Sequence, residues 1–85
     1  MKEEINRLQW KCRRGMREID LLLREFSLID IKNLDDKDIS TFDEVLDYDD
    51  QTLFDFIFKN QPIGNKDHES FIIKNLKTFT EQGNF

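Results

Sequence analysis

Hydrophobic residues recur at helical spacing in five stretches of the chain, and this pattern predicts five short helices. The clearest stretch runs from about Gly15 to Leu28. Its apolar residues fill an arc of about 120° when successive residues are placed about 100° apart. They are Met16, Ile19, Leu22, Leu23 and Phe26. An arc of this width indicates an amphipathic helix that buries one face in a core.

The first and last stretches have narrower apolar stripes. The first runs from about Glu3 to Arg13, and its stripe consists of Ile5, Leu8 and Cys12. The last runs from about Lys66 to Glu81, and its stripe consists of Ile72, Leu76 and Phe79. Gly83 follows the last stretch at the place where a glycine commonly ends a helix. Both stretches are therefore predicted to be helices.

Acidic residues precede the third and fourth stretches at positions suited to helix N-caps. Asp35 or Asp36 would cap the third, whose apolar residues at helical spacing are Ile39, Phe42, Val45 and Leu46. Asp49 or Asp50 would cap the fourth, which continues through the apolar run at residues 53–58. That run alone is compatible with a strand. It is short, follows a helix cap and has no partner strand, so we expect a helix.

The five predicted helices are joined by tight links, which favours an all-α fold, a small bundle of about five short helices. The link at residues 60–65 contains Pro62 and Gly64, as turns commonly do. A chain of 85 residues is long enough for one domain at most. We therefore expect residues 1–85 to form a single helical domain with frayed termini.

Charge and cysteine content narrow the classes of partner and compartment. The formal net charge of −5 disfavours nucleic acid and anionic membranes, which attract clustered lysine and arginine. Cys12 is the only cysteine, so no intrachain disulfide forms, and a reducing compartment fits. No apolar run approaches the roughly 20 residues that span a membrane. We expect a cytoplasmic, bacterial protein that does not insert into a membrane.

The sequence offers little for catalysis or metal binding. His68 lies in the first turn of the last predicted helix among charged residues, and Cys12 lies on an apolar stripe. The acidic run at residues 47–50 lacks the glycine and distal glutamate of a calcium loop. Helix capping and a surface that faces a partner are the two remaining interpretations of that run. We expect neither an enzyme nor a metal site.

Aromatic residues leave two interpretations open. Phe54, Phe56 and Phe58 cannot all lie on one face of a helix, and Trp10 lies well off the stripe of its own helix. Core packing accounts for one or two of the phenylalanines. The others, together with Trp10, are candidates for an interface, where aromatic residues are enriched.

Three arginines and two acids surround one glycine at residues 13–20. Gly15 would cost about 1 kcal/mol inside a helix, so it suits a turn or a close backbone approach, such as tight packing of the first helix across the second. If the second helix begins near Arg14, then Arg14, Arg17 and Glu18 project together, opposite the apolar face. An Arg14–Glu18 pair would stabilise the helix by only a few tenths of a kcal/mol. A solvated helix joint and a recognition surface both remain open.

The run from Trp10 to Asp20 resembles the opening signature of the succinate dehydrogenase FAD assembly factors, of the bacterial SdhE type and its mitochondrial relatives. The core Arg-Gly-x-x-Glu motif of that family is matched by Arg14, Gly15 and Glu18. Residues 49–56 resemble a second segment of the family, in which Gln51 replaces the usual proline. The resemblance covers essentially the whole chain and implies a five-helix bundle.

The resemblance also implies a function without catalysis by the chain itself. The family binds the flavoprotein subunit of succinate dehydrogenase, and in some bacteria that of fumarate reductase, and promotes covalent attachment of FAD to a histidine of that client. We expect a monomer that holds no cofactor stably and acts on FAD attachment in its client. The expected partner-binding residues are Arg14, Gly15, Arg17, Glu18, Asp20, Trp10, Asp49 and Asp50. An adaptor or antitoxin-like module that sequesters another protein is the alternative.

Overall fold

The computed structural model describes residues 2–81 and is all-helical over that range, with no strand. The helices are α1 (Lys2–Lys11), α2 (Arg17–Ile29), α3 (Asp36–Val45), α4 (Asp50–Lys59), α5 (Lys66–Phe71) and α6 (Thr78–Glu81). A 3-10 turn, η1 (Ile31–Asn33), follows α2, and a π-helical segment, η2 (Ile72–Lys77), joins α5 to α6. Because α5, η2 and α6 are continuous, the predicted bundle of five helices is confirmed. Gly83 and the ends predicted to fray lie outside the described residues.

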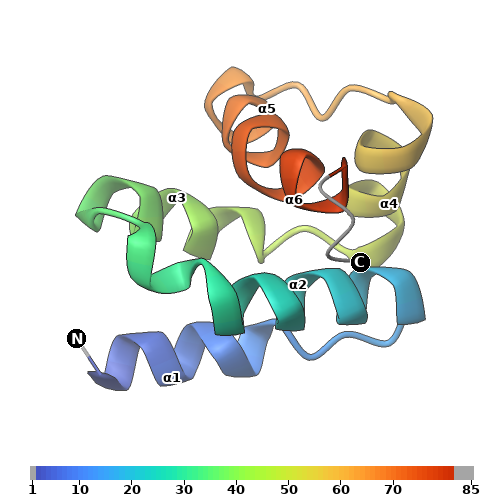
Figure 1. The fold of residues 1–85 in the computed structure, drawn as a ribbon. Helices are drawn as coiled ribbons and strands as arrows, with labels where there is room; N and C mark the ends of the chain where they lie inside the picture. The colour runs from blue at the N-terminus through green and yellow to red at the C-terminus, as the bar shows by residue number, and fades with distance from the viewer. Residues whose placement is uncertain (1, 82–85) are drawn as a thin grey trace.

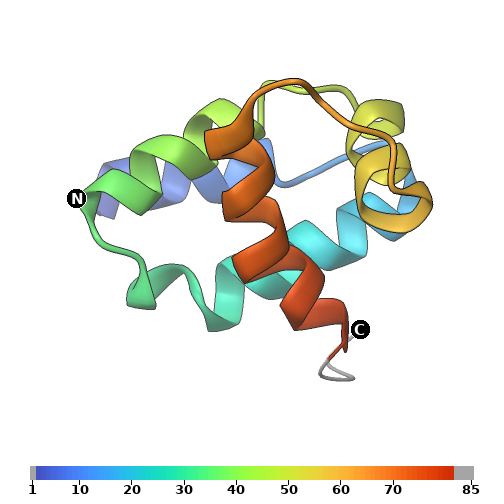
Figure 2. The ribbon, with the colours of Figure 1, turned by 90° about the horizontal axis from the view of Figure 1, so that it is seen from above.

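The helices pack around α2, which lies at the centre of the contacts (Figure 1). Helix α1 runs antiparallel beside α2, joined to it by the α1–α2 loop (residues 12–16). Helix α4 and segment η2 also contact α2, and α3 contacts α5. Seen from above, the continuous helix formed by α5, η2 and α6 runs across α2 (Figure 2). None of the described helices is both long enough and apolar enough to cross a membrane.

Three phenylalanines from three helices meet in the core. Phe26 lies edge-on to Phe42 and to Phe79, with ring centroids 5.3 Å and 5.9 Å apart. Edge-to-face pairs of this kind add stability beyond the area that the rings bury. All three rings are essentially inaccessible to solvent, and each belongs to an apolar stripe that the sequence predicted. The helical periodicity therefore identified the core faces of α2, α3 and the last helix.

The ends of α3 and α4 are capped as the sequence predicted. The Asp35 carboxylate accepts the backbone N–H of Asp38 at 2.8 Å, and the Asp49 carboxylate accepts that of Thr52 at 2.7 Å. These bonds satisfy N–H groups that have no partner within the first helical turn. The apolar run at residues 53–58 is therefore a helix, as expected.

The phenylalanines of α4 divide between the core and the surface. Leu53 and Ile57 form the buried stripe of the helix, Phe54 and Phe56 pack partly buried against the core, and 42% of Phe58 is exposed. A core role for part of this aromatic set is therefore confirmed. An interface role for the rest stays a prediction.

Candidate functional site

The side chain of Arg14 joins the α1–α2 loop to the loop between α3 and α4 (residues 46–49). Its Nε donates to Oδ1 of Asp50 at 2.7 Å. Its Nη1 donates to the carbonyls of Leu46 at 2.8 Å and Lys11 at 3.2 Å, and its Nη2 donates to the carbonyl of Tyr48. Only 12% of the side chain is exposed. The fixed fork of the guanidinium thus holds together segments that lie more than thirty residues apart in sequence.

Asp50 accepts a hydrogen bond from the Arg14 guanidinium and also holds the backbone of the α1–α2 loop. Its second oxygen, Oδ2, accepts the backbone N–H of Met16 at 3.0 Å. Burial disfavours the ionised carboxylate, but the hydrogen bonds from Arg14 and Met16 outweigh burial, so the pKa of Asp50 lies below its usual value. Asp50 is therefore an ionised anchor for the loop.

Asp20 fixes the same loop from the other side. Its Oδ1 accepts the backbone N–H of Arg14 at 2.8 Å, and its Oδ2 accepts Nη1 of Arg24 at 3.3 Å. Asp20 therefore holds the backbone of Arg14 and the side chain of Arg24. Asp49 caps α4, as described above.

One geometric prediction is wrong: Arg14 does not project beside Arg17 and Glu18. Helix α2 begins at Arg17, whereas the sequence predicted a start near Gly15, and Met16 has an extended backbone at φ −83° and ψ 123°. Outside a helix, Arg14 is not one turn away from Glu18. Its guanidinium turns inward to Asp50 and to backbone carbonyls, which offer more hydrogen bonds than a single exposed carboxylate.

Gly15 in the α1–α2 loop and Arg17 and Glu18 at the start of α2 are all exposed; we call these three residues the loop edge. A Cβ added at Gly15 would have one neighbour within 4 Å, Oδ2 of Asp50 at 3.8 Å, which is an ordinary van der Waals distance. Gly15 also does not have a positive φ. The expectation that Gly15 allows α1 to pack tightly across α2 is therefore wrong. Within residues 2–81, the fold places no demand on a glycine here.

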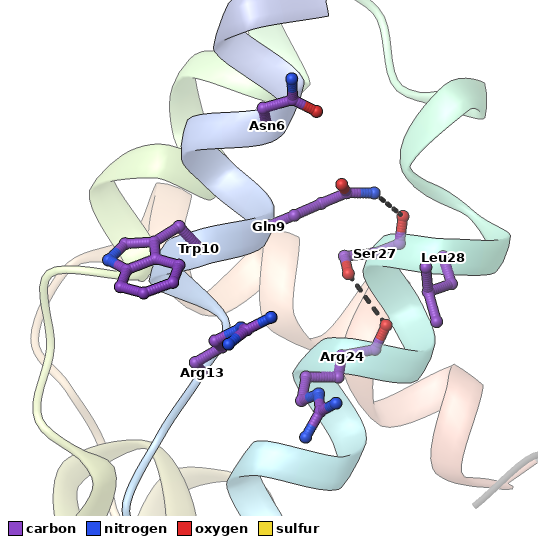
Figure 3. A pocket seen from close by; sticks show the side chains of 7 residues that line it. All are labelled: Asn6, Gln9, Trp10, Arg13, Arg24, Ser27 and Leu28. Carbon is purple, nitrogen blue, oxygen red and sulfur yellow. Dashed lines mark hydrogen bonds between the residues drawn. The ribbon is translucent and has the colours of Figure 1, made fainter.

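A shallow groove of about 260 Å³ lies between α1 and α2 (Figure 3). Trp10 and Arg13 lie on its α1 side, with the guanidinium carbon of Arg13 4.9 Å from the centre of the Trp10 ring. Arg24 and Leu28 lie on its α2 side. The exposed fractions of Trp10 and Leu28 are 68% and 69%. The sequence singled out Trp10 because it lies off the apolar stripe, but it gave no sign of the groove.

Helix α1 is held to α3 by an ion-pair cluster that the sequence did not reveal. Arg7 donates to both oxygens of Asp43, at 3.1 and 2.8 Å. Nζ of Lys11 donates to Oδ1 of Asp43 at 2.6 Å and to Oδ1 of Asp47 at 2.9 Å. Hydrogen bonds from Arg7 and Lys11, partly opposed by burial, lower the pKa of Asp43 to about 2. These partners lie more than thirty residues apart, so no local pattern indicates them.

His68 belongs to a hydrogen-bonded chain that crosses three segments. Its Nδ1 is 2.6 Å from the hydroxyl of Tyr48, and its Nε2 is 2.8 Å from Oε1 of Glu44. The backbone carbonyl of Tyr48 also accepts a hydrogen bond from Arg14, so these hydrogen bonds extend from His68 to the α1–α2 loop.

Cys12 is fully buried, and burial raises the pKa of its thiol to about 11. Within residues 2–81, no group of three or more metal-ligating side chains comes together.

The fold and the anchored loop define a small all-helical protein in which the side chains of Arg14, Asp20 and Asp50 hold the α1–α2 loop in place. Residues 6–80 match the family described as "Flavinator of succinate dehydrogenase". The chain belongs to this family, which confirms the resemblance seen in the sequence.

Curated relatives support the same assignment. The chain is 40% identical over 58 residues to the FAD assembly factor SdhE of Legionella pneumophila (strain Paris), which covers 68% of this chain and 73% of that protein. It is 38% identical over 55 residues to the protein of the same name from Pectobacterium atrosepticum, covering 65% of this chain and 62% of that protein. For the Mannheimia succiniciproducens protein of that name, the identity is 42% over 53 residues, 62% of each. No solved structure matches the chain significantly.

Proposed function

We propose that this protein is an assembly factor that binds the flavoprotein subunit of succinate dehydrogenase and promotes covalent attachment of FAD to it. The proposal extends to the flavoprotein subunit of fumarate reductase. It is supported by membership of the flavinator family and by relatives named FAD assembly factors. The bond-forming chemistry belongs to the flavin and the client, so the protein acts by binding and not as an enzyme.

The observation that carries this proposal is the exposed Gly15. No contact and no backbone angle within the described chain requires a glycine there. A glycine on an exposed, well-anchored loop is explained if another backbone has to approach it closely. Arg17 and Glu18 lie exposed beside it and offer charge-assisted hydrogen bonds of both signs. The loop edge is therefore the surface that we assign to the client.

The other predicted site residues divide into two roles under this proposal. Arg14, Asp20 and Asp50 are positioning residues because their side chains are bonded within the chain and hold the loop edge in shape. Asp49 supports them indirectly by capping α4. Trp10 remains a contact residue because its ring is exposed. A loop that is rigid before binding loses less conformational entropy on association.

Binding alone is sufficient to promote the attachment. The client's domains have to hold the flavin and the accepting histidine in a reactive arrangement, and a partner that binds that arrangement preferentially raises its population. No side chain here is assigned a chemical step, since the Cys12 thiol is buried and both ring nitrogens of His68 are hydrogen-bonded. FAD stays with the client throughout. The single cysteine and the net charge of −5 support action as a monomer in the cytoplasm.

The test is covalent flavin fluorescence on the flavoprotein subunit in cells that lack the gene, complemented by variants. We expect the wild-type gene to restore the fluorescence and Glu18→Ala to restore it poorly. Glu25→Ala is the matched control because Glu25 is an exposed glutamate two turns further along the same helix. Unchanged flavin attachment in the deletion strain would contradict the proposal and favour an adaptor that sequesters another protein.

A further inference from the structure

The groove between α1 and α2 combines two exposed apolar side chains with two arginines. Trp10 and Leu28 are its large apolar residues, and Arg13 and Arg24 are its charged ones (Figure 3). None of the residues that line it is acidic, although acids outnumber bases by 18 to 13 in the whole chain. The groove is therefore a local basic and apolar surface on an acidic protein.

The arginines of the groove remain available to a partner. Arg13 stacks on the Trp10 ring, and its side chain makes no ion pair within residues 2–81. Arg24 makes one bond, to Asp20 at 3.3 Å, and 55% of its side chain is exposed. Glu25 follows Arg24 in sequence but points about 100° further round the helix. The charge that faces the groove is accordingly positive.

Exposed residues on one face of α2 lead from the loop edge to the groove. Arg17, Leu21, Arg24 and Leu28 follow one another at helical spacing of three or four residues, and all four are exposed. The apolar face of α2 that packs in the core lies on the other side of the helix. An unpartnered strip therefore runs from the surface assigned to the client to the groove.

The size of the groove favours a protein side chain over a whole cofactor. Pockets for small molecules and cofactors enclose roughly 300–1,000 Å³ and bury most of the ligand. This groove is smaller, about 260 Å³, and lies on the surface between two helices. Tryptophan and arginine are also the residues that most often dominate binding between proteins.

We infer that this groove is a second contact for the same flavoprotein client and that it binds a segment bearing an apolar side chain flanked by carboxylates. The apolar side chain lies between Trp10 and Leu28, and the carboxylates pair with Arg13 and Arg24. This inference rests on the proposed function, since it takes the occupant from the same client. It adds an anchor further along α2 than the loop edge.

The experiment measures the affinity of the purified protein for the purified flavoprotein subunit by calorimetry. We expect Trp10→Ser and Leu28→Ser each to raise the Kd about tenfold or more, the range of a binding hot spot. Ile73→Ser is the matched control for an exposed apolar residue, because 52% of Ile73 is exposed on a different helix. Circular dichroism verifies that each variant is folded.

Charge is tested by Arg13→Glu, with Lys32→Glu as the control for an exposed basic residue outside the groove. We expect Arg13→Glu to weaken binding and to reduce its dependence on salt, whereas Lys32→Glu leaves both unchanged. If the wild type binds but all three groove variants bind equally well, the inference is overturned and the proposed function stands. If the wild type does not bind the flavoprotein subunit, the result contradicts the proposed function itself.

Two other occupants give distinct results. A groove that binds a second copy of this chain gives concentration-dependent dimers in light scattering that Leu28→Ser abolishes. A groove that binds the flavin itself gives a titration of free FAD that Trp10→Ser abolishes. Either result, with unchanged affinity for the flavoprotein, would overturn the inference.

Discussion

Arg14 and Asp50 form an ion pair at 2.7 Å that fastens the α1–α2 loop to the first turn of α4. Their side chains are 12% and 23% exposed, so solvent screens this pair less than the others in the bundle. The guanidinium also donates hydrogen bonds to two backbone carbonyls of the loop between α3 and α4. The arginine of the Arg-Gly-x-x-Glu motif is therefore a structural residue, and the glycine and glutamate beside it remain at the surface.

Removing this guanidinium should destabilise the bundle. Arg14→Ala leaves the Asp50 carboxylate and three backbone carbonyls without their donor, so we expect a loss of about 2–4 kcal/mol in the free energy of unfolding. Arg14→Lys keeps the charge but not the fork, and we expect an intermediate loss. Urea unfolding measures both. Arg13→Ala is the control, and an equal effect of Arg13→Ala and Arg14→Ala would contradict the structural role.

The ion-pair cluster on Asp43 predicts a stability that falls in acid. Arg7 and Lys11, against the effect of burial, lower the pKa of Asp43 from 3.8 to about 2. A carboxyl whose pKa is lower in the folded state stabilises the fold above its unfolded pKa, and that stabilisation is lost as the pH falls towards the folded pKa. We expect Asp43→Asn to lose part of this pH dependence between about pH 4 and about pH 2, whereas Asp67→Asn keeps it. Parallel stability curves for Asp43→Asn and wild type would refute the cluster.

The hydrogen bond between Tyr48 and His68 predicts a small and local effect. Tyr48→Phe removes the hydroxyl and leaves Nδ1 of His68 without this partner, at a cost of about 1 kcal/mol. We expect faster amide hydrogen exchange in α5 and in the loop between α3 and α4, with little change in α1. Unchanged exchange in α5 would show that the hydrogen bond does not hold these segments together.

Cys12 should be unreactive while the protein is folded. Its thiol is buried, and burial raises its pKa to about 11, so the reactive thiolate is scarce near neutral pH. We expect iodoacetamide at about pH 8 to label Cys12 only after denaturant unfolds the chain. Rapid labelling of the native protein would place the thiol at the surface.

The helices were predictable from the sequence, because burial in a small core imposes a regular spacing on apolar residues. Ile19, Leu22 and Phe26 follow that spacing, and all three are buried. The N-cap of Asp49 was predictable for a similar reason, since it joins groups only three residues apart. The π-helical segment was missed because its buried residues, Ile72 and Leu76, still follow the predicted stripe.

The anchoring of the loop by Arg14 and Asp50 was not predictable, because these two residues are distant in sequence. Arg14 had a neighbouring carboxylate at Glu18, and local spacing favoured that pair over one with Asp50, thirty-six residues away. The choice depends on where α2 begins and on how α4 packs against it. Trp10 could be assigned to the surface, but the other wall of the groove is formed by residues of α2, among them Arg24 and Leu28, which are distant from Trp10 in sequence.

The central claim is that the exposed Gly15 lies against the backbone of the flavoprotein. Gly15→Leu tests it, because a leucine fills the space that an approaching backbone needs. Leucine is uncharged, so it does not compete with Arg14 for the Asp50 carboxylate. Gln61→Leu, at an exposed position between α4 and α5, is the control. Calorimetry with the purified flavoprotein subunit should show binding by Gln61→Leu and none by Gly15→Leu, with equal urea midpoints for both. A folded Gly15→Leu that binds as tightly as the wild type would contradict the account.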